Sequence, residues 1–323
     1  MCEGSRVKNL AYELHRRSRF AKVDDRRVRE VALILKDFPL KVPTWDFHPF
    51  YPQSDDFEEM CLYYLIFNSI NYCYFDQDFE KFRDGETGYS GSSLASYRLT
   101  QTWDEIKDPR FLANVDENYL LGELFLADRP ISMVKERTHA LREVGDFLLK
   151  NTDFTFEKFF RKHQRNAYRA SQALPVLLPS WRDPFAKRSQ LFVGMVYGRF
   201  QDREDLPLDE SSIKDLTVFA DYRVPQTLIA MGILRPHSML LTRINRRNLI
   251  GPSSRMELEL RAASVVSADV LKDNLIEVRR DKTINILHVD FLLWNAARQK
   301  NNMPVELFKG FWPEHHLTIT TDY

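Results

Sequence analysis

Apolar residues recur at helical spacing along most of this 323-residue chain, and this periodicity restricts the possible folds more than any other feature. The clearest examples directly follow two acidic pairs, Asp24-Asp25 and Asp55-Asp56, which are typical of helix starts. Further helices are predicted over residues 132–149, 155–172 and 184–201. The sequence therefore predicts a mainly α-helical protein.

Alternating strand patterns are scarce, and only a few short β-strands are expected. The segments 81–100 and 277–287 are the candidates, because glycines punctuate the first and a charged turn interrupts the second. No tandem repeat, linker or low-complexity tract divides the chain. We expect one domain over 1–323, with a possible N-terminal half (1–175) and C-terminal half (176–323).

One expected helix start lies beside an acidic residue of particular interest. Val224 precedes a proline and should be extended, whereas Pro225 has the fixed φ that suits the first position of a helix. Asp221 therefore lies too far upstream to be simply the helix cap. Downstream, Ser254 and Glu257 have the spacing of a capping box, which predicts another helix start.

A second acid lies within an apolar stripe near the C-terminus. Asp290, Leu293 and Ala297 share one face of the helix predicted from Leu287 onward. Because burying an unpaired charge is costly, Asp290 must cap the helix, pair with a cation or bind a ligand.

The charge balance argues against a polymer or membrane partner. Lys and Arg total 46, and Asp and Glu also total 46, so no net field attracts a nucleic-acid backbone or an anionic bilayer. No apolar run has the length of a signal peptide or of a membrane span, and we expect a cytosolic protein.

Cysteine and histidine usage predicts neither disulfides nor a metal site. Cys2, Cys61 and Cys73 are too few and too irregularly spaced for a disulfide framework or a zinc site, so reduced thiols are expected. Two adjacent histidines, His315 and His316, have no spaced partners and are expected on the surface. No cofactor site is apparent.

Six segments together resemble the queuosine salvage proteins, and they follow one another in the order expected for that family. They are NSINYCYF (68–75), GYSG (88–91), FAKRSQLF (185–192), FADYRVPQ (219–226), ELELRAAS (257–264) and VDFLLWNAAR (289–298). The likeness runs from about Val28 to Tyr323.

This resemblance implies a helical fold similar to that of the helix-hairpin-helix DNA glycosylases. It implies a hydrolase that cleaves the N-glycosidic bond of queuosine 5'-monophosphate and releases queuine and ribose 5-phosphate, so that queuine can be salvaged for tRNA modification. The expected partner is thus a small molecule, without stable nucleic-acid binding, and the expected state is a monomer without cofactor or metal.

The resemblance also implies roles for particular residues. Asp221 matches the catalytic acid, which acts as nucleophile or as electrostatic stabiliser of the ribose cation. Asp290 matches a contact to the base, and Phe219 matches an aromatic residue that stacks on it. Spacing alone favours blander roles: a turn for Asp221, a helix N-cap for Asp290 and core packing for Phe219.

Four further residues are candidates for substrate binding. His48 matches a family histidine at the ligand, although an isolated histidine is more often satisfied by its own loop. Lys187 is a candidate cation for the 5'-phosphate, whereas most helical lysines are solvated. Tyr222 and Trp294 are candidate stacking residues, although large aromatics on a helical stripe are usually packing.

Two positions depart from the family pattern. Phe291 stands where a tyrosine is expected, and Asn295 stands where a second acid is expected. Both remain candidate binding residues, and the changes should affect affinity more than chemistry. Two other functions stay open: a base glycosylase acting on DNA or tRNA, and a non-enzymatic queuine-binding protein.

Overall fold

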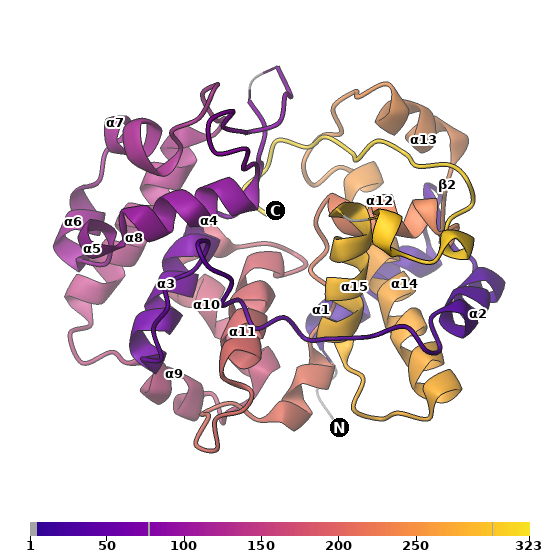
Figure 1. The fold of residues 1–323 in the computed structure, drawn as a ribbon, viewed down its shortest axis with the longest axis horizontal. Helices are drawn as coiled ribbons and strands as arrows, with labels where there is room; N and C mark the ends of the chain where they lie inside the picture. Colours follow the sequence, from indigo (N-terminus) through magenta and orange to yellow (C-terminus); the bar gives the residue numbers. More distant parts are fainter. Residues whose placement is uncertain (1–4, 77, 299) are drawn as a thin grey trace. The chain divides into compact units, whose positions relative to one another are not determined.

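The computed structural model describes residues 5–76, 78–298 and 300–323, and helices dominate it (Figure 1). The prediction of a mainly α-helical protein with few short strands is confirmed. The chain divides into two compact units. Unit 1 combines Met1–Pro43 with Ser211–Ile319, and unit 2 combines Thr44–Glu210 with Thr320–Tyr323. These boundaries fall elsewhere than between residues 175 and 176.

Unit 1 is organised around one long helix, α14 (Arg255–Arg279). Figure 1 shows the indigo helices α1 and α2 beside α14, although they lie far apart in the sequence, and α12 and α15 also pack on it. The remaining elements of unit 1 are α1 (Arg6–Arg16), β1 (Ala21–Val23), α2 (Asp25–Ile34), α12 (Arg223–Ala230), β2 (Leu234–Pro236), α13 (Ser238–Asn245), α15 (Ile286–Arg298), η4 (Lys300–Asn302) and η5 (Val305–Leu307). A short 3₁₀ helix, η3 (Glu210–Asp215), lies at the boundary with unit 2.

Unit 2 is built around α3 (Phe57–Ile70), which packs against α8 and α11 and buries nearly all of its side chains. A helix that is apolar on all sides must be covered on all sides, and this explains its central position. The remaining elements are α4 (Ser92–Gln101), α5 (Trp103–Ile106), α6 (Pro109–Asn114), α7 (Glu117–Tyr119), η1 (Leu120–Leu124), α8 (Val134–Lys150), α9 (Phe156–Lys162), α10 (Ala167–Leu177), η2 (Pro179–Trp181) and α11 (Lys187–Phe200).

The predicted acidic helix starts are confirmed. The Asp24 carboxylate accepts a hydrogen bond from the Arg27 amide (3.2 Å), and the Asp56 carboxylate accepts one from the Glu59 amide (2.7 Å). Each side chain satisfies an amide that the first helical turn leaves unpaired. Ser254 likewise accepts from the amide of Glu257 at 3.4 Å at the start of α14.

Several predictions of secondary structure are wrong. The helix expected over 155–172 is broken into α9 and α10, because Gln164 and Arg165 have positive φ angles and Asn166 caps a new helix. No strand forms over 277–287, where α14 ends and α15 begins. The segment 81–100 holds only isolated bridges at Lys81, Arg83 and Ser90, and then the helix α4. The described strands are instead β1 and β2, an antiparallel pair in which Ala21 lies opposite Pro236.

The carbonyl end of α3 is held by buried cations within unit 2. Arg188 donates to the Ser69 carbonyl at 3.3 Å, and Lys187 donates to the Asn71 carbonyl at 3.3 Å. Arg137, which is fully buried, donates to the Ile70 carbonyl between them. The positive charges complement the negative end of the helix dipole.

The two described cysteines agree with the expectation of reduced thiols. Cys61 and Cys73 are buried and form no disulfide, and burial raises the pKa of both thiols; Cys2 lies outside the described residues.

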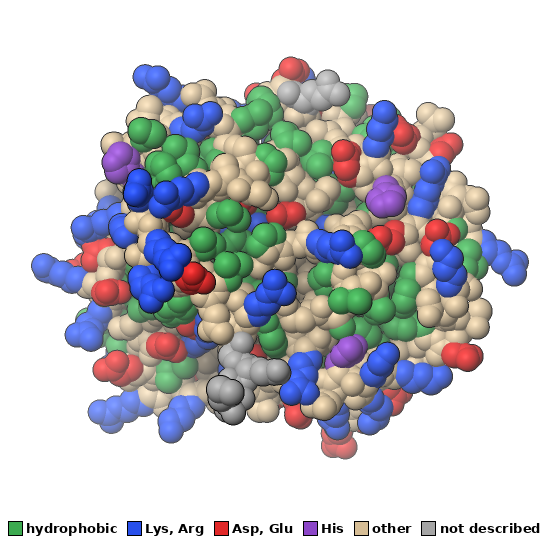
Figure 2. All heavy atoms as spheres, turned by 180° about the vertical axis from the view of Figure 1, so that it is seen from behind, with side chains coloured by type: hydrophobic (Ala, Val, Ile, Leu, Met, Phe, Trp, Pro, Cys, Tyr) green, Lys and Arg blue, Asp and Glu red, His purple; other side chains and the backbone are tan. Residues whose placement is uncertain are grey.

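Among the described helices, none is long and apolar enough to cross a bilayer. On the face shown in Figure 2, Lys and Arg side chains are interspersed with Asp and Glu.

Gly145 permits the close approach of α6 and α8. A methyl group at this position would overlap the backbone of Ala113. We expect Gly145→Ala to lower the free energy of unfolding by about 1–3 kcal/mol, as overpacking commonly does. Thermal unfolding should show a melting temperature several degrees lower, whereas Gly122→Ala, which meets nothing within 4 Å, should leave it nearly unchanged.

Candidate active site

Asp221 caps the helix that follows it. One carboxylate oxygen, Oδ1, accepts hydrogen bonds from the amides of Arg223 (2.7 Å) and Val224 (3.0 Å). Helix α12 therefore begins at Arg223, and the prediction of an extended Val224 before a start at Pro225 is wrong. Proline fits because amides of the first helical turn need no intrahelical acceptor.

The capping interaction distinguishes the two oxygens of this carboxylate. Within the described part of the chain, the hydrogen bonds of the Asp221 carboxylate all go to Oδ1. The side chain is partly exposed. Asp221 thus combines a fixed orientation with a second oxygen, Oδ2, that capping does not use, so the turn-forming and functional interpretations are compatible.

Asp290 is bonded to the same turn. Its Oδ1 accepts the Phe219 amide at 2.9 Å, across 71 residues of sequence. Asp290 lies in the second turn of α15, and Asn285 instead accepts the Leu287 amide at the helix start (3.0 Å), so the N-cap alternative is wrong. The structure therefore links the two acids, because Asp290 is hydrogen-bonded to Phe219, two residues before Asp221.

A buried ion pair lies on the other side of this turn. Arg261 and Glu257, one helical turn apart on α14, form the ion pair that this spacing favours, at 3.3 Å and with side chains 0% and 2% exposed. A second contact has no signal in the sequence: Arg261 Nε donates to the Ala220 carbonyl at 3.0 Å. No local spacing signals this contact, because 41 residues separate donor and acceptor.

The aromatic candidates of unit 1 differ in exposure. Phe219 is buried at 4% exposure, in agreement with the core-packing alternative, and its stacking role stays a prediction. Tyr222 is partly exposed, with its ring 4.9 Å from that of His315 and 5.4 Å from the Arg223 guanidinium. Tyr222 is therefore held in place by neighbours at the start of α12.

Helix α15 presents a partly exposed face that contains the other candidates. Asp290, Phe291, Trp294 and Asn295 are all partly exposed. The rings of Phe291 and Trp294 are nearly parallel, with an interplanar angle of 18° and centroids 6.3 Å apart. The Arg298 guanidinium lies 4.6 Å from the Trp294 centroid and occupies part of its face. Carboxylate, amide and aromatic groups thus share one helix face.

His48 and Lys187 belong to unit 2, whereas the other candidates belong to unit 1. His48 is exposed in a loop. Lys187 is 5% exposed and begins α11, so the expectation of a solvated lysine is wrong. Its backbone amide donates to the Asp183 carboxylate at 2.7 Å, so the helix predicted from residue 184 begins slightly later. Their contacts to a ligand stay predictions.

The C-terminal histidines are not both at the surface. His316 is 3% exposed, and burial, aided by the charges of His315 and Arg261, lowers its pKa to about 3. The expectation of a surface location is therefore wrong for His316, because Gln226 draws this segment onto α12 by donating to the Pro313 carbonyl (2.9 Å). No group of three potential metal ligands occurs among the described residues.

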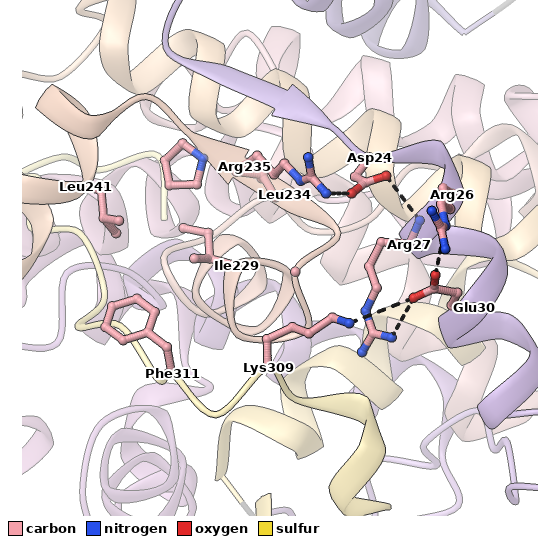
Figure 3. Close-up of a pocket in the computed structure, with 12 residues that line it drawn as sticks. Asp24, Arg26, Arg27, Glu30, Ile229, Leu234, Arg235, Leu241, Lys309 and Phe311 are labelled. Atoms are coloured by element: carbon pink, nitrogen blue, oxygen red, sulfur yellow. Dashed lines mark hydrogen bonds and ion pairs between the residues drawn. The ribbon is translucent and has the colours of Figure 1, made fainter.

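A cavity of about 600 Å³ lies elsewhere in unit 1 (Figure 3). Ile229, Leu241 and Phe311 line one part, while the other part has ion pairs such as Arg235–Asp24 and Lys309–Glu30. The charged groups are engaged with one another, and none of the predicted site residues lines this cavity. It is therefore separate from the candidate site.

The fold and the site define a helical protein with two carboxylates and several aromatic side chains gathered at α12 and α15. The chain belongs to the queuosine salvage protein family, whose model matches residues 50–320. The resemblance read from the six sequence segments is thereby confirmed.

Similar proteins carry one name across distant organisms. The relative from Sphaerobacter thermophilus is 27% identical over 289 residues, covering 86% of this chain and 87% of its own. The relative from Bos taurus is 28% identical over 339 residues, covering 93% of each chain, and that from Mus musculus is 25% identical over 307 residues, covering 87% and 90%. All three are named queuosine 5'-phosphate N-glycosylase/hydrolase.

Proposed function

We propose that this protein hydrolyses the N-glycosidic bond of queuosine 5'-monophosphate, releasing queuine and ribose 5-phosphate for salvage of the base into tRNA modification. The main support is the arrangement of the two acids. Asp290 accepts a hydrogen bond from the start of the turn that leads into Asp221, and Asp221 accepts one from the first amide of α12. Family membership and the shared name of the relatives support the same reaction.

Asp221 acts on the ribose. Departure of the base leaves positive charge on the sugar, and a fixed negative group beside it lowers the barrier. The two amides at the start of α12 hold Oδ1, and the positive end of the helix dipole favours a negative charge there. Oδ2 then serves as nucleophile or as electrostatic stabiliser.

Asp290 acts on the base. Queuine is a 7-deazapurine and has no N7 to protonate, so hydrogen bonds at other edges must assist its departure. A carboxylate offers about four lone-pair positions, and the Phe219 amide occupies one of those on Asp290. In this proposal Asp290 also accepts the N–H groups of the guanine-like edge, while Phe219, Phe291, Trp294 and Tyr222 supply apolar contact to the ring.

In this proposal Asn295 binds the ammonium group on the side chain of queuine, and it binds that group more weakly than an acid would. A carboxylate accepts a stronger hydrogen bond from an ammonium than an amide does, by about 1 kcal/mol. Asn295→Asp should therefore tighten binding roughly fivefold. Calorimetry in an Asp221→Asn background measures this without turnover, and 7-deazaguanine, which lacks the amine, is the control ligand. An unchanged dissociation constant for queuosine 5'-monophosphate would argue against the contact.

The proposed substrate is a mononucleotide instead of a polymer. A glycosylase acting within DNA or tRNA needs a positive groove and a wedge side chain, and the chain's balanced charge does not favour such a groove. We accordingly propose a cytosolic monomer that binds nucleic acid at most weakly.

Comparison of three substrates tests the function. Purified protein is incubated separately with queuosine 5'-monophosphate, the nucleoside and intact queuosine-containing tRNA, and free queuine is detected by mass. We expect release from the monophosphate first and fastest. Release from tRNA alone would instead support the polymer glycosylase, and binding of queuine without any release would support the non-enzymatic alternative.

A further inference from the structure

The turn that leads into Asp221 is held by side chains at its start and at its tip. The Asp221 amide donates to the Phe219 carbonyl at 2.6 Å, which closes a tight turn with Ala220 at its tip. The Phe219 amide donates to Asp290, and the Ala220 carbonyl accepts from Arg261. Because the Ala220 carbonyl belongs to the peptide unit that continues into Asp221, Arg261 restrains the orientation of that peptide.

Arg261 is itself oriented by Glu257. The Arg261 guanidinium is completely buried, and its Nη1 lies 3.3 Å from Glu257 Oε1. Both side chains come from the rigid first turns of α14, whose N-cap Ser254 fixes the helix start. The planar guanidinium holds its donors in a fixed fork, so one nitrogen bonds Glu257 while another bonds Ala220.

A gain in folding stability does not by itself explain the buried Arg261–Glu257 pair. Removing two charges from water carries a large desolvation penalty, and apolar residues of similar volume often replace buried pairs with no loss of stability. A buried guanidinium that reaches a specific carbonyl beside the catalytic acid provides, in contrast, a defined geometry. Displacement of a reacting group by about 1 Å can lower a rate about a hundredfold.

We propose that Arg261 is a positioning residue for catalysis, which aligns Asp221 through its hydrogen bond to the Ala220 carbonyl while Glu257 orients the guanidinium. This inference rests on the proposed function of Asp221. Arg261 does not contact the substrate in this account, and it acts only through the backbone of the turn.

The test compares two conservative variants. Arg261→Lys keeps the charge but loses the fork, and we expect kcat per folded molecule to fall about 10- to 100-fold with KM changed less than about threefold. Arg27→Lys is the matched control, because Arg27 is also buried in unit 1 and donates to backbone carbonyls, those of Met231 and Leu307. The control should lose stability without losing kcat.

A double variant addresses the case in which Arg261→Lys fails to fold. Glu257→Leu combined with Arg261→Met removes both charges of the pair together, so neither is left buried without the other. We expect it to fold and to show the same loss of kcat. Unchanged kcat in a folded Arg261 variant, an equal loss in Arg27→Lys, or an effect on KM alone would each overturn the proposal.

Hydrogen exchange separates this inference from the proposed function. In either Arg261 variant, the peptide covering Phe219–Val224 should exchange faster than in the wild type, while the peptide covering α1 should not change. This readout requires no activity. If the wild type releases no queuine, the proposed function fails, and unchanged exchange at Phe219–Val224 would reject the positioning role independently.

Discussion

Asp221→Asn is expected to lower kcat by about a hundredfold or more while leaving the protein folded. Removing one preorganised electrostatic group from a site commonly has an effect of about 3 kcal/mol on the barrier. Asparagine is as good a helix cap as aspartate, so its Oδ1 can still accept the amides of Arg223 and Val224. Steady-state kinetics with queuosine 5'-monophosphate, beside thermal unfolding, measures both properties.

A second helix cap provides the control for the loss of negative charge at a capping position. Asp108 is an exposed cap whose carboxylate accepts the Arg110 amide at 2.8 Å at the start of α6. Asp108→Asn makes the same chemical change at a residue that is not among the predicted site residues, and it should retain full activity. Wild-type kcat in Asp221→Asn would remove Asp221 from the chemistry.

Asp290→Asn should raise KM about 10- to 100-fold with little effect on stability. A hydrogen bond to a charged group contributes about 1.5–3 kcal/mol, and the substitution replaces one acceptor oxygen with a donor that opposes the N–H groups of the base. Asparagine Oδ1 still accepts the Phe219 amide, so the turn should remain intact.

Asp290→Leu separates ligand binding from support of the turn. Leucine leaves the buried Phe219 amide without its acceptor, which should lower the free energy of unfolding by a further ~1–3 kcal/mol. Asp281→Asn, in the loop before α15, is the control and should leave KM unchanged. A normal KM in Asp290→Asn would show that the base does not bind this carboxylate.

Local signals predicted the helix starts well. Asp24 and Asp56 cap their helices as expected, because a capping side chain acts on amides only two or three residues away. Similarly, Glu257 and Arg261 are four residues apart on α14, a spacing that favours the ion pair they form. Such interactions are determined within one helical turn and can therefore be read from sequence.

The errors arise where the chain direction changes or where distant segments meet. Short apolar runs such as Ile284–Leu287 fit a buried strand or a helix start equally well, and the left-handed Arg280 ends α14 before them. The pairing of β1 with β2 has no local signature, since the partners come from distant parts of the chain. Tertiary contacts decide both cases.

The sequence indicated candidate residues for the site but not the hydrogen bonds between them. Motif resemblance indicated Asp221 and Asp290 individually, and the ionic partner of Arg261 followed from helical spacing. The bonds from Asp290 to Phe219 and from Arg261 to Ala220 span 71 and 41 residues. Only the fold brings these groups together, so the restrained turn at Asp221 could not be inferred from the sequence.

Product stoichiometry in a single turnover tests whether the protein hydrolyses the N-glycosidic bond with the help of Asp221. Enzyme in excess is mixed with queuosine 5'-monophosphate, and queuine and ribose 5-phosphate are quantified by mass over time. We expect both products to appear at equal rates and in equal amounts with the wild type. With Asp221→Asn, both should appear at least about a hundredfold more slowly. Tight binding of the nucleotide with neither product formed would contradict it.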